Sequence, residues 1–209
     1  LGLDLSEVRD LTACTLVALV DGKFQTKTTF WLPSHGLKEK SSADRVPYDM
    51  WAKQGFLETI EGKSIEYSYI AAYIRNLFDE LDVRSCAFDR WNFRHFKRSL
   101  IDVGFTEDDI ELKFKEFGQG FQSMSPALRD TESAILHGKL LHDNNPVMNM
   151  CAANAVIQSD PAGNKKLTKA KSSGIDGMIS LVMAVAMAST HEEELIPTSP
   201  WDDPNFKYG

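Results

Sequence analysis

The segment 12–33 reads TACTLVALVDGKFQTKTTFWLP, and its pattern decides the fold class. Residues 12–20 and 24–32 are rich in Thr, Val, Phe and Leu, and the second run alternates polar and apolar side chains, which is typical of strands. The Asp-Gly pair at 21–22 favours a tight hairpin turn, because glycine accepts positive φ. Residues 2–5 have the pattern of a shorter strand. The chain is therefore expected to open with a sheet of three antiparallel strands.

Helices and further strands are expected to alternate along the remaining chain. Ser41 with Asp44 resembles a capping box, which predicts a helix to about residue 54. Residues 57–62 read as an irregular or edge segment, and apolar spacing predicts an amphipathic helix from residue 65. The other expected helices are 92–103, 125–137, 147–153 and 175–188, and the other expected strands are 83–88, 111–117 and 154–159, the last opening a hairpin that projects as far as residue 171.

This order predicts an α/β fold, a mixed sheet flanked by helices, over residues 1–190. An irregular tail is expected over residues 191–209. No apolar run is long enough to cross a bilayer, and the N-terminus lacks the pattern of a secretory signal. The chain begins without Met and already in a strand-like pattern, so we expect it to be a fragment of a longer polypeptide. Three widely spaced cysteines (Cys14, Cys86, Cys151) lack zinc-site spacing and are interpreted as buried reduced thiols in a reducing compartment.

The charge distribution bears on the class of partner. The formal net charge is −7, which alone argues against a general nucleic-acid binder. Basic residues nevertheless gather in two clusters, Arg90, Arg94, Lys97 and Arg98 in the first, and Lys165, Lys166, Lys169 and Lys171 in the second. The clusters fit a phosphate track beside an acidic active site, and they equally fit two solvated faces.

Three aspartates stand at the ends of predicted core elements. Asp4 lies in the apolar first strand, Asp89 follows the strand 83–88, and Asp176 opens the last helix. If these carboxylates converge, their charges repel one another, and a divalent cation relieves that repulsion. Oxygen ligands suit Mg²⁺ or Mn²⁺, and two such ions roughly 3.5–4 Å apart activate water and stabilise the leaving oxygen of a phosphodiester.

Each aspartate also has a local interpretation. Asp4 is then a turn acceptor, Asp89 a helix N-cap and Asp176 a first-turn residue favoured by the helix dipole. Residue patterns alone leave the two interpretations open. Asp10 is a candidate for a supporting role, and His95 is a candidate phosphate contact.

Several segments resemble a known family, the C-terminal nuclease domain of tailed-phage terminase large subunits. The likeness extends from residue 1 to about 187. Its segments are GLDLS at 2–6, DLTA at 10–13, RVPY at 45–48, FDRW at 88–91, IDG at 175–177 and, as the most specific of them, GQGFQSMSP at 118–126.

The resemblance implies a ribonuclease-H-like fold and a two-metal endonuclease that cuts concatemeric double-stranded viral DNA when packaging starts and ends. Asp4, Asp89 and Asp176 match the places of the metal-binding, catalytic acids of the family, which would use Mg²⁺ or Mn²⁺. The resemblance further implies a packaging ATPase domain in the same polypeptide, a small terminase subunit and a portal as partners, and action in the cytoplasm of the infected host rather than in the mature virion. The hairpin after residue 154 would contact DNA phosphates. Residues 31–62 exceed the barest ribonuclease-H cores and receive no role.

Two other functions compete with this one. Actin-like ATPases also begin with a Gly-Leu-Asp-Leu strand, but they need glycine and a hydroxyl residue after it, where this chain has Ser6-Glu7-Val8. The second alternative is a catalytically silent docking module that keeps the fold and binds no metal. A nucleotide-binding loop is not supported, because Leu57 stands where the motif ending in Gly62-Lys63-Ser64 requires glycine.

Overall fold

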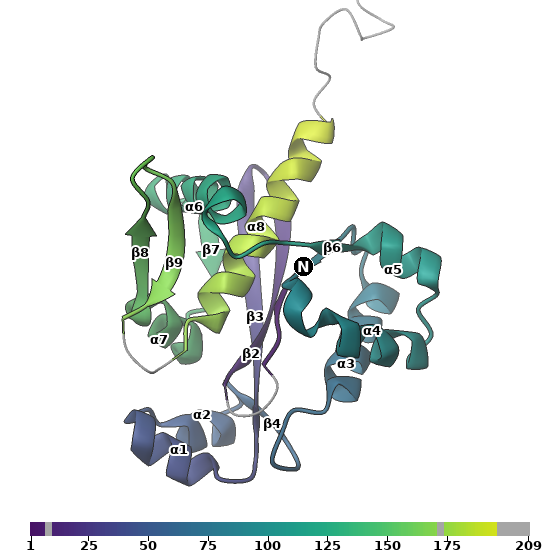
Figure 1. Ribbon diagram of the computed structural model, residues 1–209, viewed down its shortest axis with the longest axis vertical. Helices are drawn as coiled ribbons and strands as arrows, with labels where there is room; N and C mark the ends of the chain where they lie inside the picture. The colour runs from purple at the N-terminus through teal and green to yellow at the C-terminus, as the bar shows by residue number, and fades with distance from the viewer. Residues whose placement is uncertain (7–9, 171–173, 196–209) are drawn as a thin grey trace, which may run out of the picture.

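The computed structural model describes residues 1–6, 10–170 and 174–195, without the side chains at 90–92 and 191–195. Its centre is a seven-stranded mixed sheet (Figure 1). The strands are β1 (Gly2–Asp4), β2 (Thr12–Val20), β3 (Lys23–Pro33), β4 (Glu58–Ile60), β5 (Cys86–Phe88), β6 (Phe114–Glu116) and β7 (Leu140–His142). Their order is β4-β3-β2-β1-β5-β6, and β7 also pairs with β3.

The three opening strands pair antiparallel, as the sequence predicts. The turn between β2 and β3 holds Asp21 at φ 51° and Gly22 at φ 68°, the positive values that a tight hairpin needs. Strands β5 and β6 continue the sheet in parallel beyond β1. On the other side, β7 and β4 pair in parallel with the two ends of the long strand β3.

Helices cover both faces of the sheet (Figure 1). One group consists of α3 (Tyr67–Glu80), α4 (Arg90–Asp102) and α5 (Glu107–Lys113), and the other of α6 (Phe121–Leu136), α7 (Pro146–Asn154) and α8 (Asp176–Leu195). Two short helices, α1 (Leu37–Asp44) and α2 (Tyr48–Lys53), follow β3, and a separate hairpin of β8 (Ala155–Ser159) and β9 (Lys165–Lys169) lies beside α6.

Alternation along β1 decides which side chains face which helices. Leu1, Leu3 and Leu5 are buried in the cluster that contains the apolar residues of α3 and α4. Gly2 faces the opposite helix, α8, so closely that a Cβ atom there would lie 2.0 Å from the carbonyl oxygen of Ser180. Because successive strand residues point to opposite faces, Asp4 shares the α8 side with Gly2.

Buried hydroxyl groups also join α8 to the sheet, next to the close approach at Gly2. The hydroxyl of Thr15 on β2 lies 2.7 Å from that of Ser180 and 2.9 Å from that of Thr28 on β3. Gly177 sits against the ring of Phe30, where a Cβ atom would come within 2.8 Å. The N-terminal half of α8 is therefore fixed to β1, β2 and β3, and this fixes the position of Asp176.

The predicted helix from Ser41 to residue 54 is wrong, because the segment forms two helices. Arg45 adopts φ 57°, a left-handed conformation that ends α1, and α2 starts after Pro47. Ser41 lies inside α1, and its hydroxyl accepts a hydrogen bond from the backbone N–H of Asp49 at 3.3 Å. The residue read as a helix start thus stabilises the first turn of the next helix.

Other boundaries also differ from the prediction. The expected strand 111–117 is mostly helix α5, which starts at a capping box of Thr106 and Asp109, and only Phe114–Glu116 is strand. Helix α6 begins four residues before Ser125, with Pro126 inside it. Strand β7 was not expected, and α8 continues to Leu195, into the predicted tail. Residues 196–209 lie outside the described part of the chain.

We expect Gly2→Ala to lower the free energy of unfolding by about 1–3 kcal/mol or more, because the added methyl group collides with backbone atoms of α8 that cannot move independently. Urea unfolding monitored by circular dichroism measures this. Gly120→Ala is the control, since a Cβ atom at Gly120 meets nothing within 4 Å. Its cost is expected to stay below about 1 kcal/mol. Equal losses in the two variants would show that α8 does not depend on the close approach at Gly2.

Candidate functional site

Asp4 and Asp89 stand at the ends of neighbouring parallel strands. In the register of β1 and β5, Leu3 lies beside Phe88, so the next residues of the two strands are Asp4 and Asp89. Adjacent strands are about 4.8 Å apart, which brings the two residues together at one edge of the sheet. Both side chains are half-buried, so they are enclosed by the fold and still reach solvent.

Asp176 reaches the same edge from the first turn of α8. Its carboxylate folds back over Gly174, where a Cβ atom would lie 2.2 Å from Oδ2 of Asp176. The carboxylate also interacts with its own backbone N–H group, as expected at a helix N-terminus. Gly174 is thus the residue that leaves space for this side chain.

The pKa of Asp4 reflects the charges of the other two acids. Burial raises the pKa of Asp4 well above its usual value, and the charges of Asp176 and Asp89 raise it further. A hydrogen bond from the side-chain amide of Gln119, at 3.5 Å from Oδ1 of Asp4, acts in the opposite direction. Asp10 adds a smaller repulsion. The predicted acids and Asp10 therefore share one electrostatic environment.

Asp176 is perturbed in the same direction. Burial raises its pKa to about 6, its own backbone N–H opposes this, and the charge of Asp10 raises it. Lys169 and Lys40 lower this pKa, so both cations act on the site. Lys169 ends β9 of the hairpin, whereas Lys40 belongs to α1, and the two therefore reach Asp176 from different elements.

The donor set suits a hard divalent cation, although the side chains do not enclose a ready-made site. Within the described ranges, no three His, Cys, Asp or Glu side chains are grouped closely enough to hold a metal ion. The three acids and Asp10 nevertheless supply only oxygen donors, the preference of Mg²⁺. Their mutual repulsion and the burial of Asp4 are costs that a bound cation would remove. The residues present therefore fit such a cation.

Sequence reasoning missed two residues of this site, Gln119 and Lys40. Gln119 lies 115 positions from Asp4 along the chain, and the signal available for it was its place in the specific Gly-Gln-Gly run. Lys40 lies just before the predicted helix start at Ser41 and belongs to α1. Asp10 was foreseen only in a supporting role, and its exposed position beside the acids agrees with that.

The two basic clusters have different surroundings. On α4, Lys97 pairs with Glu107, and Arg98 lies 3.6 Å from Asp102, which favours a solvated face for these two residues. On the hairpin, Lys165 lies 3.5 Å from Glu132, and the Nζ atom of Lys166 lies 4.8 Å from the ring centroid of Phe121. Lys165 and Lys166 thus contact α6, whereas Lys169 acts on the pKa of Asp176. The side chain of Arg90, and Lys171 altogether, lie outside the described residues.

The remaining predicted features are placed as follows. Cys14, Cys86 and Cys151 are free and buried, as the sequence predicts. Cys151 packs beside the site, accepting a hydrogen bond from the backbone N–H of Gly177, and burial raises its pKa to about 12. His95 is exposed on α4. Among the helices that the structure describes, none is both long and apolar enough to cross a membrane.

Comparison with known sequences gives a match over nearly the whole chain. Residues 1–192 match the family described as the terminase large subunit, endonuclease domain. The large terminase subunit of Enterobacteria phage HK97 is 42% identical over 190 residues, which cover 90% of this chain and 37% of that protein. The large subunit of Lactococcus phage SK1 is 27% identical over 91% of this chain and 35% of that protein. The chain thus spans little more than a third of the length of these two relatives.

Comparison with solved structures agrees. The crystal structure of the HK97 large terminase superposes with a TM-score of 0.81 and 42% identity, covering 90% of this chain and 38% of that one. The large terminase nuclease from the thermophilic phage G20c with bound magnesium gives a TM-score of 0.56 at 11% identity, covering 88% of this chain and 78% of that one. At that identity the second match shows the fold alone. The predicted ribonuclease-H-like α/β fold is confirmed.

We expect Asp176→Asn to stabilise the metal-free protein at neutral pH. Between pH about 4 and 6 the unfolded chain has released the Asp176 proton while the folded chain retains it, so stability falls as pH rises through this window. An amide at this position avoids the free-energy cost of ionising Asp176 in the folded protein. We expect a gain in stability of about 1–3 kcal/mol and a rise in Tm of several degrees.

Thermal unfolding in chelator at pH 7 and at pH 4 measures the effect, which should shrink at the lower pH. Asp130→Asn, at an exposed position on α6, is the control and should leave Tm unchanged. A Tm for Asp176→Asn that is unchanged or lower at pH 7 would contradict the electrostatic account of the site.

Proposed function

The chain belongs to the family of terminase large subunit endonuclease domains, and from this premise we propose that it cuts double-stranded DNA by divalent-metal-dependent hydrolysis of phosphodiester bonds. The observation that carries the proposal is the position of Asp4 and Asp89 at the ends of neighbouring strands, together with the charges of Asp89 and Asp176 that both raise the pKa of Asp4. A fold has no structural need for such repelling charges, whereas a metal site requires them.

Asp4, Asp89 and Asp176 would hold Mg²⁺ or Mn²⁺ through carboxylate oxygens. Two bound ions would supply an activated water and stabilise the leaving oxygen of the phosphodiester. Gln119 keeps the carboxylate of Asp4 oriented through its amide, and Asp10 adds negative charge at the solvent side. The bound magnesium in the structure of the G20c nuclease supports divalent-metal use by this fold.

The β8–β9 hairpin would bind the DNA backbone. Lys169 at the end of β9 acts electrostatically on Asp176, and Lys165 and Lys166 lie on the same strand. Lysine contacts with phosphates fix the position of a duplex but do not read its bases. We therefore propose cleavage with little sequence preference by this domain.

The wider role is proposed from the whole-length relatives. In this proposed role, the domain cuts concatemeric DNA when packaging starts and when packaging ends. A packaging ATPase domain of the same polypeptide, the small terminase subunit and the portal are its proposed partners, and the host cytoplasm is the proposed place of action. The catalytically silent docking module is the competing function, since the acids do not form a closed metal site in the described residues.

We expect the protein to nick and linearise supercoiled plasmid in Mg²⁺ or Mn²⁺ and to leave it intact in chelator. Asp4→Asn, Asp89→Asn and Asp176→Asn should each reduce cleavage by on the order of 100-fold or more, because each removes a charged metal ligand. Gel electrophoresis of the plasmid products over time measures the rates.

Asp130→Asn serves as the matched control and should cut like the wild type. Calorimetry with Mn²⁺ separates the nuclease from the docking module. A nuclease should give a binding heat that Asp89→Asn abolishes, whereas a docking module should give none. Cleavage that persists in chelator, or full activity in the three variants, would overturn the proposed function.

A further inference from the structure

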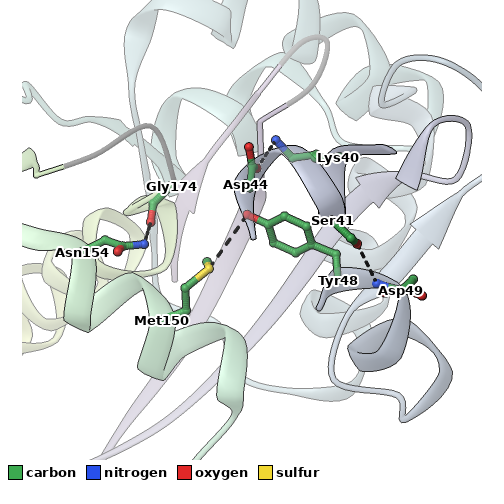
Figure 2. Close-up of polar contacts among 8 residues, drawn as sticks. All are labelled: Lys40, Ser41, Asp44, Tyr48, Asp49, Met150, Asn154 and Gly174. Carbon is green, nitrogen blue, oxygen red and sulfur yellow. Dashed lines mark hydrogen bonds and ion pairs between the residues drawn. The ribbon is translucent and has the colours of Figure 1, made fainter. Parts of the chain in front are cut away.

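Helices α1 and α2, which the family resemblance left without a role, border the acid site. Figure 2 shows Tyr48 reaching from α2 toward Met150 on α7, with Lys40 and Asp44 of α1 beside its hydroxyl end. Tyr48 is only 1% exposed, and its hydroxyl donates a hydrogen bond to Sδ of Met150 at 3.9 Å. The two helices are therefore anchored to α7 through a buried aromatic side chain.

Helix α7 connects this anchor to the segment that carries Asp176. The side-chain amide of Asn154, at the end of α7, donates to the carbonyl of Gly174 at 3.4 Å (Figure 2). Cys151, the residue after Met150, receives a hydrogen bond from the backbone N–H of Gly177. The α1–α2 pair and the start of α8, which carries Asp176, are thus held on the same helix.

Lys40 is placed at the boundary between this pair of helices and the acids. Its Nζ atom lies 3.0 Å from Oδ2 of Asp44 and 5.6 Å from the ring centroid of Tyr48. The side chain is 22% exposed, so its ammonium group is held in a defined position yet remains reachable from solvent. The influence of Lys40 on the pKa of Asp176 supports this placement.

A groove with a volume of about 660 Å³ runs along α1 from this point. It is lined by Pro33, His35, Gly36, Leu37, Glu39, Lys40, Ala43, Asp44 and Lys63. Two lysines and two acids balance in charge, so the groove supplies little long-range attraction for a polyanion. Its link to the acids is Lys40, which lines the groove and acts on the charge of Asp176.

We propose that α1 forms a second border of the DNA-binding surface, in addition to the β8–β9 hairpin, and that Lys40 binds a backbone phosphate next to the bond that is cut. The proposal rests on the proposed nuclease function. A cluster of aspartates repels the phosphates that must approach it, and cations on both flanks offset that repulsion. Lys169 supplies one flank and Lys40 the other, while Asp44 holds the ammonium group of Lys40 in position until a phosphate competes for it.

A purely structural ion pair is the alternative explanation of Lys40. Partly exposed ion pairs one helical turn apart contribute little to folding stability, so loss of such a pair would change the melting temperature only slightly. It would leave unchanged the number of ions released when DNA binds. The salt dependence of binding therefore distinguishes a phosphate contact from a structural role.

The experiment measures binding of a short fluorescein-labelled DNA duplex by anisotropy, in chelator and over a range of KCl concentrations. Lys40→Ala should weaken binding about 5- to 10-fold for unrelated duplex sequences and reduce the slope of log K against log salt by about 0.9, the value for one phosphate contact. Lys40→Arg should restore most of the affinity and the slope. Lys169→Ala should behave like Lys40→Ala.

Lys38→Ala is the matched control, because Lys38 lies on the same helix, is exposed and is absent from the groove. It should leave both affinity and slope unchanged. Lys40→Gln, which keeps most of the side-chain length, replaces Lys40→Ala if thermal unfolding shows that the alanine variant is misfolded. Equal binding by the Lys38 and Lys40 variants, or a loss of affinity with an unchanged slope, would overturn the proposal. Because no metal is present, this outcome does not depend on whether plasmid is cut.

Discussion

The close packing of α8 on Gly2 is the constraint on which the rest of the structure depends. The carbonyl of Ser180 occupies the space that a side chain at Gly2 would take, so the helix lies directly on the first strand. Asp4 is two residues beyond Gly2, and Asp176 is one helical turn before Ser180. A glycine without chemistry of its own therefore determines the separation between two carboxylates that carry the proposed chemistry.

The acid site lowers the stability of the folded protein. Burial and like charges raise the pKa of Asp4 and of Asp176, while Gln119, Lys40 and Lys169 offset only part of that cost. Neutral residues at these positions would give a more stable sheet edge. The proposed nuclease function accounts for these charges, because a bound cation would remove the cost, and the chain belongs to an endonuclease family.

Local patterns predicted much of the fold and the places of the three acids at the ends of strands and at a helix start, because neighbouring residues determine strand alternation and element ends. The β2–β3 hairpin followed from its Asp-Gly turn, and Asp4 and Asp89 from their places at strand ends. Ser41 was misread, since the left-handed turn at Arg45 outweighed a capping pattern. The hydrogen bond of Gln119 to Asp4 and the charge effect of Lys40 on Asp176 join segments more than a hundred residues apart, and no local pattern encodes such interactions.

The way in which β3 is paired has a consequence for self-association. Its outer edge is shared, with β7 beside residues 24–26 and β4 beside residues 31–33. Four residues of backbone remain between these partners, and the opposite border of the sheet is the three-residue strand β6. Open edges are where sheets of separate molecules fuse into aggregates, and short ones offer little template for it. Dividing one long edge between two short strands thus protects the domain from fibre-like stacking at high local concentration.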